Sequence, residues 1–279
     1  MKRKNNLSFY GMKWNPFCHS VPVEGIVSNP EIENFCFRVE HLLAEGGYGM
    51  ISGEPGTGKS VALRLLHNHL SGLRDITVRV ITRPQSKLSD FYRELGSLFG
   101  IELKVSNRFG GYLALREKWT HFIQSTLLRP VLLIDESQEM LPSVLSELRF
   151  LGSTEFDSEI ILVVVLCGDR RLNEKLSTPE LLPLGSRIHT RLSMDSMPRE
   201  KMLFLLEESI RYAGYPNLMT RGLIENLVDH AVGNLRILMN MAKDLLLVGL
   251  DREMNPLDEK LFLEVFSPPL GRKNTGQKR

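Results

Sequence analysis

One nine-residue stretch constrains the fold of this chain more than any other: "SGEPGTGKS" at residues 52–60. It lies between apolar "YGMI" and apolar "VALRLL", so a flexible loop joins a predicted strand to a predicted helix. Gly53, followed after four residues by Gly58-Lys59-Ser60, has the spacing of a P-loop, whose backbone N–H groups bind phosphate at a helix N-terminus. An ordinary glycine-rich turn is the alternative, and it does not require the Lys-Ser ending. The loop therefore predicts a nucleotide site, with Lys59 on the β- and γ-phosphates and Ser60 on Mg²⁺.

Two adjacent acids follow the apolar run of another predicted strand, "PVLLIDE" at residues 130–136. The carboxyl ends of parallel strands meet at one edge of a sheet, where α/β proteins bind their ligands. Carboxylates directly after buried residues are costly unless an ion lies beside them, although a strand that simply runs out into solvent is the alternative. Beside a P-loop, we predict that Asp135 holds Mg²⁺ through water and that Glu136 polarises the attacking water.

Strand and helix patterns alternate through the first two thirds of the chain. Strands are predicted at 48–52, 75–82, 130–136 and 160–167, and helices at 29–46, 60–70, 87–100, 111–128 and 143–153. This alternation predicts an α/β fold with a parallel sheet and helices on both faces. After Met197-Pro198 only helical patterns recur, which predicts a small helical lid. We expect an arm at 1–30, a core at 31–197, a lid at 198–268 and a basic disordered tail at 269–279.

Charge and cysteine content exclude several classes of function. The net charge is +2, but the first four residues carry +3 and the last nine carry +4, which leaves −5 for residues 5–270. Nucleic-acid binding would therefore need a local basic patch rather than bulk charge. The three cysteines are far apart, without a CxxC motif, so neither a zinc site nor a disulfide framework is expected. The sequence shows no signal-peptide pattern, and its longest apolar run is too short to cross a bilayer, so we expect a cytoplasmic protein without a membrane contact.

Four further residues stand at positions where a nucleotide site could use them. Asp169 ends the strand pattern "LVVVLCG", Arg187 and Arg191 lie in "GSRIHTR", and Arg236 begins a predicted helix in "VGNLR". From spacing alone, a turn aspartate and ordinary surface arginines explain these residues equally well or better.

The motifs "GEPGTGKS", "LLIDESQEM", "LSELRFLGS", "VLCGDRRL", "SRIHTR" and "GNLRILMNMA", in this order and behind the opening "FYGMKWNPF", resemble the AAA+ ATPases of the ExeA/GspA type. That family is related to the transposition regulators TnsC, TniB and MuB. The resemblance covers residues 7–250 and implies a P-loop AAA+ core with a lid, an ATPase activity, and ATP and Mg²⁺ as cofactors. The residues that it assigns to ATP are Gly53, Glu54, Pro55, Gly56, Thr57, Gly58, Lys59, Ser60, Val61 and Arg236.

The resemblance also gives each polar residue of the site a role. It makes Lys59 and Ser60 the Walker A pair, and Asp135 and Glu136 the Walker B pair, with Ser60 and Asp135 at the metal. Asp169 falls at sensor 1, Arg236 at sensor 2, and Arg187 and Arg191 fall in the region of the arginine finger. Two positions depart from the family pattern. Sensor 1 is usually a neutral amide or hydroxyl, so Asp169 argues against fast hydrolysis, and Leu235 stands where a proline often precedes the sensor 2 arginine.

The resemblance leaves three functions open. Secretion ATPases of this type usually continue into a membrane span and a wall-binding domain, and we expect neither after the lid of this protein. Its length resembles that of a helper that assembles on duplex DNA as a ring or filament and presents the target to a transposase, in some cases with a target-selection protein. The second possibility is a soluble ATPase that assembles secretion or pilus proteins. The third is a nucleotide-dependent switch without a DNA role.

Two basic loops favour the DNA function. "RPQSK" carries Arg83 and Lys87, in a region that faces DNA in the transposition relatives, and "KVSNRF" adds Lys104 and Arg108. Cations beside short polar side chains suit phosphate contacts without base readout. Each cation by itself is better explained by solubility. Together they predict binding to duplex DNA that is independent of its sequence.

Overall fold

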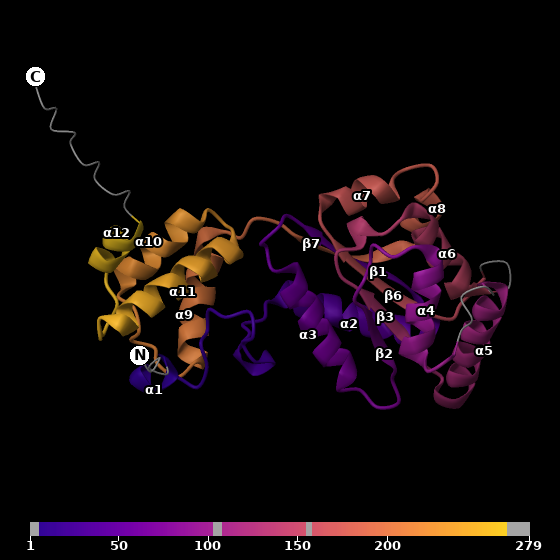
Figure 1. Cartoon of the computed structure of the whole chain (residues 1–279), viewed down its shortest axis with the longest axis horizontal. Helices are drawn as coiled ribbons and strands as arrows, with labels where there is room; N and C mark the ends of the chain where they lie inside the picture. Colours follow the sequence, from indigo (N-terminus) through magenta and orange to yellow (C-terminus); the bar gives the residue numbers. More distant parts are fainter. Residues whose placement is uncertain (1–5, 103–107, 155–157, 267–279) are drawn as a thin grey trace, which may run out of the picture. The chain divides into compact units, whose positions relative to one another are not determined.

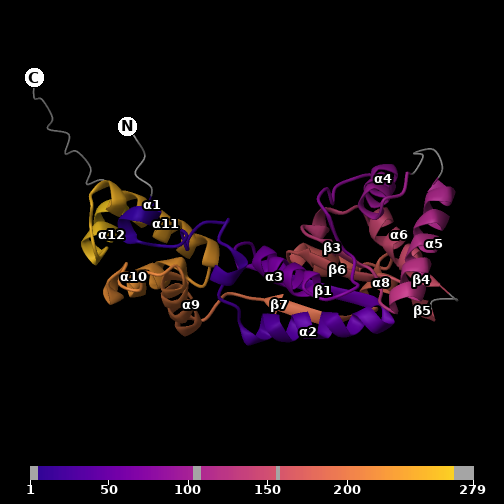
Figure 2. The ribbon, with the colours of Figure 1, turned by 90° about the horizontal axis from the view of Figure 1, so that it is seen from below.

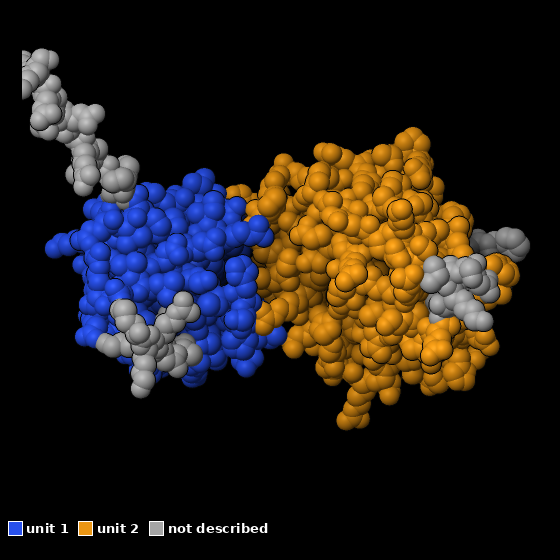
Figure 3. All heavy atoms as spheres, viewed as in Figure 1, with its two compact units in different colours: residues 1–27, 197–279 blue, residues 28–196 orange. Residues whose placement is uncertain are grey.

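The computed structural model describes residues 6–102, 108–154 and 158–266. The chain divides into two compact units, coloured separately in Figure 3. Residues 28–196 form one, here called the α/β unit, and residues 1–27 together with 197–279 form the other, here called the helical unit. The chain therefore begins in the helical unit, crosses into the α/β unit and returns.

The α/β unit is built on a five-stranded sheet in which every neighbouring pair is parallel. In spatial order the strands are β2 (Val78–Ile81), β3 (Val131–Ile134), β6 (Val163–Gly168), β1 (Gly47–Gly53) and β7 (Ile188–Met194). A separate antiparallel pair, β4 (Ser153–Thr154) and β5 (Glu159–Ile160), follows α6 in the chain. The predicted parallel sheet is thus confirmed.

Helices cover both faces of this sheet (Figure 1). One face carries α2 (Pro30–Glu45) and α3 (Lys59–Ser71). The other carries α4 (Leu88–Phe99), α5 (Arg108–Thr126), α6 (Pro142–Gly152), α7 (Arg170–Leu176) and α8 (Leu182–Gly185), of which α4, α5 and α6 are gathered together in Figure 2. In β3, Val131 and Leu133 pack toward α2 and α3, whereas Leu132 and Ile134 pack toward the opposite layer. Burial on both sides explains why this strand is a continuous apolar run.

The patterns above predict four strands, and β7 is a fifth that they miss. It lies at the edge of the sheet beside α2 (Figure 2). Its residues "IHTRLSM" are alternately buried and exposed. This alternation ordinarily indicates a half-buried strand. The segment also contains Arg191, which the family resemblance places in the region of the arginine finger.

The helical unit consists of α9 (Arg199–Tyr212), α10 (Arg221–Ala231), α11 (Leu235–Asp251), α12 (Glu259–Phe266) and the N-terminal segment, which contains α1 (Asn6–Tyr10) and the 3-10 turn η1 (Val23–Gly25). In the described part of the chain, no helix combines the length and the apolar character needed to cross a membrane. The predicted tail at 269–279 lies outside the described residues.

The N-terminal segment differs from the separate arm that we expected, because its apolar side chains belong to the core of the helical unit. Tyr10, Met12 and Phe17 are buried in one cluster with α9, α10, α11 and α12. The Tyr10 hydroxyl donates to the carbonyl of Met254 over 2.9 Å, and the Lys13 N–H donates to the carbonyl of Ala213 over 2.7 Å. The described N-terminal segment is therefore held against α9 to α12 by buried contacts.

A buried carboxylate joins three helices of the α/β unit. Glu147 on α6 is 6% exposed, accepts a hydrogen bond from the Tyr92 hydroxyl of α4, and forms an ion pair with Arg108 of α5. Burial and the bond to Glu147 raise the pKa of Tyr92. Arg108, one of the predicted DNA contacts, is thus engaged within its own unit.

The N-terminal segment can be tested as part of the folded core. Phe17→Ala removes a side chain that is 2% exposed, and we expect it to lower the free energy of unfolding of the helical unit by about 3–5 kcal/mol. Phe9→Ala, at a half-exposed neighbouring phenylalanine, is the control and is expected to have a much smaller effect. Chemical denaturation measures both, and equal stability of the two variants would contradict the buried role of the segment.

The Glu147 cluster gives a second test. Arg108→Ala leaves a buried carboxylate without its cation, so we expect the α/β unit to lose roughly 1–3 kcal/mol of stability. Arg83→Ala is the matched control, since that arginine is exposed and forms no ion pair with another described residue; it is expected to change stability by less than about 0.5 kcal/mol. Urea denaturation distinguishes the two roles, and similar values for the two variants would argue against a structural role of Arg108.

Candidate nucleotide site

The P-loop joins the end of β1 to the start of α3 in a conformation that leaves backbone N–H groups available. Gly56 and Gly58 have φ of +88° and +101°, in the left-handed region that favours glycine. The Ala62 N–H donates to the carbonyl of Gly58 over 3.0 Å and begins the bonding pattern of the helix. The N–H groups before it lie at the positive end of the helix, where an anion is stabilised.

Lys59 and Ser60 are the first two residues of α3. Lys59 is only 9% exposed, and its ammonium donates to the carbonyl of Glu54 over 2.9 Å, as does the Thr57 hydroxyl. A buried ammonium with one carbonyl partner has donors left for phosphate oxygens, so the loop fits a nucleoside triphosphate. Ser60 is exposed beside it and fits a magnesium ligand.

The two acids after β3 lie in a tight turn. Asp135 is half-buried and accepts a hydrogen bond from the Glu136 N–H over 2.9 Å, whereas the Glu136 side chain is exposed. Glu136 has φ of +52°, which is uncommon for a residue with a side chain. The Cys167 thiol of β6 is buried against Asp135, and its pKa is raised, mainly by burial. The structure thus brings together at one edge the half-buried acid predicted for the metal and the exposed acid predicted for catalysis.

Gln138 is a residue of this site that the sequence analysis does not select. It lies in the 3-10 turn η2 (Ser137–Glu139), and its side chain is buried. Its amide nitrogen donates to Oε2 of Glu136, and its amide oxygen accepts from the backbone N–H of Asp169 over 3.2 Å. Its position two residues after Glu136 is the only available sequence signal, and by itself that signal is weak.

Asp169 directs its carboxylate toward its own helix. It caps α7 by accepting from the Arg171 N–H over 2.9 Å, and it forms an ion pair with the Arg171 guanidinium at 2.8 Å. The hydrogen bonds from Arg171 hold the pKa of Asp169 below its usual value. Arg171 also pairs with Glu139 at 2.8 Å. The acid predicted for sensor 1 therefore forms an ion pair with a neighbouring arginine.

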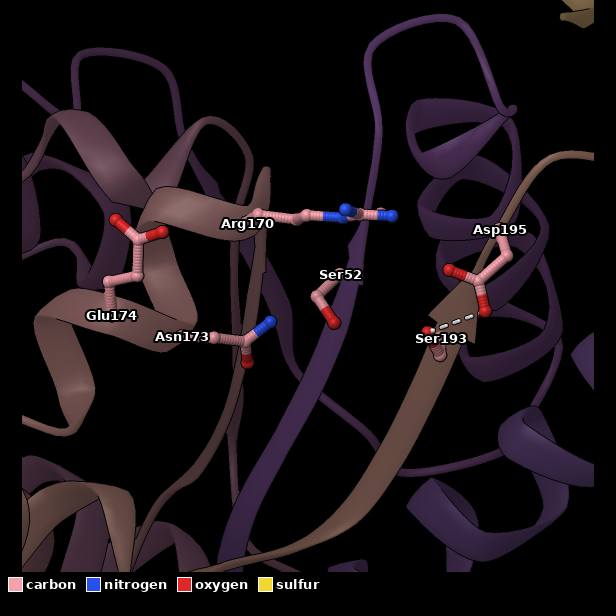
Figure 4. Close-up of a pocket in the computed structure, with 7 residues that line it drawn as sticks. Ser52, Arg170, Asn173, Glu174, Ser193 and Asp195 are labelled. Atoms are coloured by element: carbon pink, nitrogen blue, oxygen red, sulfur yellow. Dashed lines mark hydrogen bonds between the residues drawn. The ribbon is translucent and has the colours of Figure 1, made fainter.

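A pocket of about 360 Å³ lies at the ends of β1 and β7, with α7 on its other side (Figure 4). Arg170 reaches across it and pairs with Glu54 of the P-loop at 2.7 Å. On β7, the Ser193 hydroxyl donates to Asp195 over 3.3 Å. The remaining lining residues are Ser52, Gly53, Asn173 and Glu174. This polar pocket adjoins the P-loop and connects it to α7.

The predicted arginine-finger residues lie around α8 and β7. Arg191 donates to the carbonyls of Ile188 and Gly185, each over 3.0 Å, and Arg187 donates to the carbonyl of Pro183. Both guanidinium groups are therefore engaged within their own chain. Arg236 is exposed in the first turn of α11, whose N-cap is Asn234, and belongs to the helical unit. Its contact with the nucleotide stays a prediction.

The predicted DNA contacts have different surroundings. Arg83 and Lys87 are exposed on the connection from β2 to α4, and neither forms an ion pair with another residue in the described ranges. Arg108 pairs with Glu147, and Lys104 lies outside the described residues. Of the four, only Arg83 and Lys87 share one described loop.

Comparisons of the sequence with known proteins identify an AAA domain and a relative. A family model described as an AAA domain matches residues 43–176. The general secretion pathway protein A of Aeromonas hydrophila is 30% identical in an alignment of 193 residues, which covers 66% of this chain and 33% of that protein. The chain thus spans about a third of that curated relative.

Solved structures share the fold at low sequence identity. The ADP form of the Aeropyrum pernix ORC2 protein has a TM-score of 0.69 at 13% identity, over 89% of this chain and 70% of the other. Drosophila ORC bound to DNA has a TM-score of 0.67 at 16% identity, over 95% and 67%. With its P-loop, its five-stranded parallel sheet and an AAA domain at residues 43–176, the chain has the fold of a P-loop AAA+ ATPase.

Proposed function

We propose that this protein is an ATP-dependent regulator of DNA transposition, which oligomerises on duplex DNA and presents it to a transposase. The observation that supports DNA contact is the exposed basic loop with Arg83 and Lys87. β2 and β3 are parallel neighbours, so this loop leaves the same edge of the sheet as the turn of Asp135 and Glu136. Gln85 of the loop donates to Glu139 after that turn over 3.4 Å.

The nucleotide chemistry follows from the site residues. Lys59 and the N–H groups of the P-loop bind the phosphates, and Glu136 orients the attacking water and accepts its proton. Magnesium, held by Ser60 and by Asp135 through water, would neutralise charge on the phosphates. Asp169 replaces the neutral group usual at sensor 1 and is engaged by Arg171, so we expect slow turnover, with ATP acting mainly to lock the assembly.

An oligomer would supply the DNA contacts and the arginine at the nucleotide that one copy lacks. Two cations per copy are too few for tight DNA binding at physiological salt, but a ring or filament repeats them at high effective concentration. We assign Arg187 or Arg191 to the nucleotide of a neighbouring copy, where an arginine would stabilise transition-state charge. For this role the guanidinium has to leave the carbonyls that it binds within its own chain.

A second function has its own support. The relative from Aeromonas hydrophila is named a general secretion pathway protein, which favours an ATPase that assembles protein components without binding DNA. Both functions use the same nucleotide site, and a DNA-binding measurement separates them.

The nucleotide site is tested by two substitutions. Lys59→Ala should abolish ATP binding, because it removes the cation nearest the phosphates. Glu136→Gln should bind ATP as the parent does but stop turnover, since the amide keeps the size and loses the basic oxygen. Calorimetry measures binding and phosphate release measures turnover. Parent-like ATP affinity in the Lys59 variant would overturn the assignment.

The DNA role is tested by reversing the charge of the loop. Arg83→Glu with Lys87→Glu should eliminate binding to duplex DNA and leave ATP affinity unchanged. In the parent, DNA affinity should require ATP, fall steeply with salt and be nearly independent of DNA sequence. Fluorescence anisotropy of a labelled duplex, with and without ATP over a salt series, measures all three.

The matched control is Arg74→Glu with Lys118→Glu, which changes the net charge equally at exposed residues outside the loop. This control should retain DNA binding. If the loop variant binds DNA as the parent does, the loop is not the contact. A parent that ignores DNA in every nucleotide state would instead favour the protein-assembly ATPase.

A further inference from the structure

We propose that Gln138 is a positioning residue for ATP hydrolysis, which fixes the carboxylate of Glu136 and ties it to the backbone at the end of β6. The inference rests on the proposed role of Glu136 as the group that accepts the proton of water. It concerns a side chain that the P-loop and Walker motifs do not include.

The orientation of the Gln138 amide is determined by its two partners. The backbone N–H of Asp169 can only donate, so the amide oxygen of Gln138 must face it, at 3.2 Å. The NH₂ group then faces Oε2 of Glu136, to which it donates. Gln138 is 5% exposed, so these bonds compete little with water. The side chain thus links the catalytic turn after β3 to the first residue after β6.

The glycine at the end of β6 makes room for this link. A Cβ atom at Gly168 would lie 2.6 Å from Oε1 of Gln138, closer than such atoms approach in proteins. Any side chain at position 168 would therefore displace the amide oxygen that accepts from Asp169. Gly168 serves here to admit the Gln138 amide.

The backbone on either side of Gln138 is also held in place. The Ser137 hydroxyl donates to the carbonyl of Ile134 over 2.8 Å. The Lys175 ammonium of α7 donates to the carbonyl of Gln138 and, over 2.8 Å, to that of Met140. Because the backbone is fixed, the Gln138 amide reaches Glu136 from a rigid base, and small movements of that base would misplace the carboxylate.

The chemical consequence follows from the different surroundings of the two carboxylate oxygens of Glu136. The amide occupies Oε2 of Glu136, which leaves Oε1 to accept the proton of the attacking water. Without the amide the exposed carboxylate of Glu136 would lose the side-chain hydrogen bond that orients it. A misplacement of about 1 Å at a reacting group can cost about 100-fold in rate. Gln138 therefore acts on turnover rather than on ATP affinity.

The experiment measures kcat and ATP affinity in four variants. In Gln138→Ala, and in Gln138→Glu, which keeps the size of the side chain, kcat should fall about 10- to 100-fold with ATP affinity within about twofold of the parent. Gly168→Ala should lower kcat in the same way, since its added Cβ displaces the amide. Gln124→Ala, an exposed glutamine of α5, is the control and should leave both constants unchanged.

A double substitution separates positioning from a structural role. In a Glu136→Gln background, Gln138→Ala should cause no further loss of the residual single-turnover rate, because the carboxylate that it positions is already gone. Equal losses in the two backgrounds, or an unchanged kcat in Gln138→Ala and Gln138→Glu, would overturn the proposal. Parent-like turnover in Glu136→Gln alone would instead refute the proposed role of Glu136, so the two failures are distinguishable.

Discussion

Burial of β1, β3 and β6 on both faces of one parallel sheet is the constraint on which the rest of the α/β unit depends. Because both faces are covered by helices, polar groups of these strands can reach solvent only at their ends. Parallel pairing puts every carboxyl end at the same edge. The P-loop, the Asp135–Glu136 turn and Asp169 therefore meet there, although they are far apart in the chain.

At that edge, a set of polar side chains connects the loops to one another. Gln138 links Glu136 to the backbone of Asp169, Arg171 links Asp169 to Glu139, and Arg170 links α7 to Glu54 of the P-loop. The exposed ion pairs contribute little stability individually, whereas the Gln138 amide is largely buried and its hydrogen bonds are costly to lose. The geometry of the Asp135–Glu136 turn thus depends more on Gln138 than on the surrounding charges.

The helical unit is organised by contacts between the described N-terminal segment and the four helices α9 to α12. Tyr10, Met12 and Phe17 contribute to the same core as α9 to α12, and the α/β unit is inserted between these two segments in the sequence. Loss of the N-terminal segment would therefore expose the apolar side chains of α9 to α12 that it covers.

Local patterns in the sequence determined the P-loop, the buried strand before Asp135 and Glu136, and the positions of most helices, because spacing and periodicity are properties of neighbouring residues. Tertiary structure alone decided the role of Arg108, which pairs with a buried Glu147 on another helix. It also decided that β7 joins the sheet, that Phe17 is a core residue, and that Gln138 contacts the backbone of Asp169. In each of these cases the decisive energy comes from burial against a segment distant in the chain, and no local pattern records which segment that is.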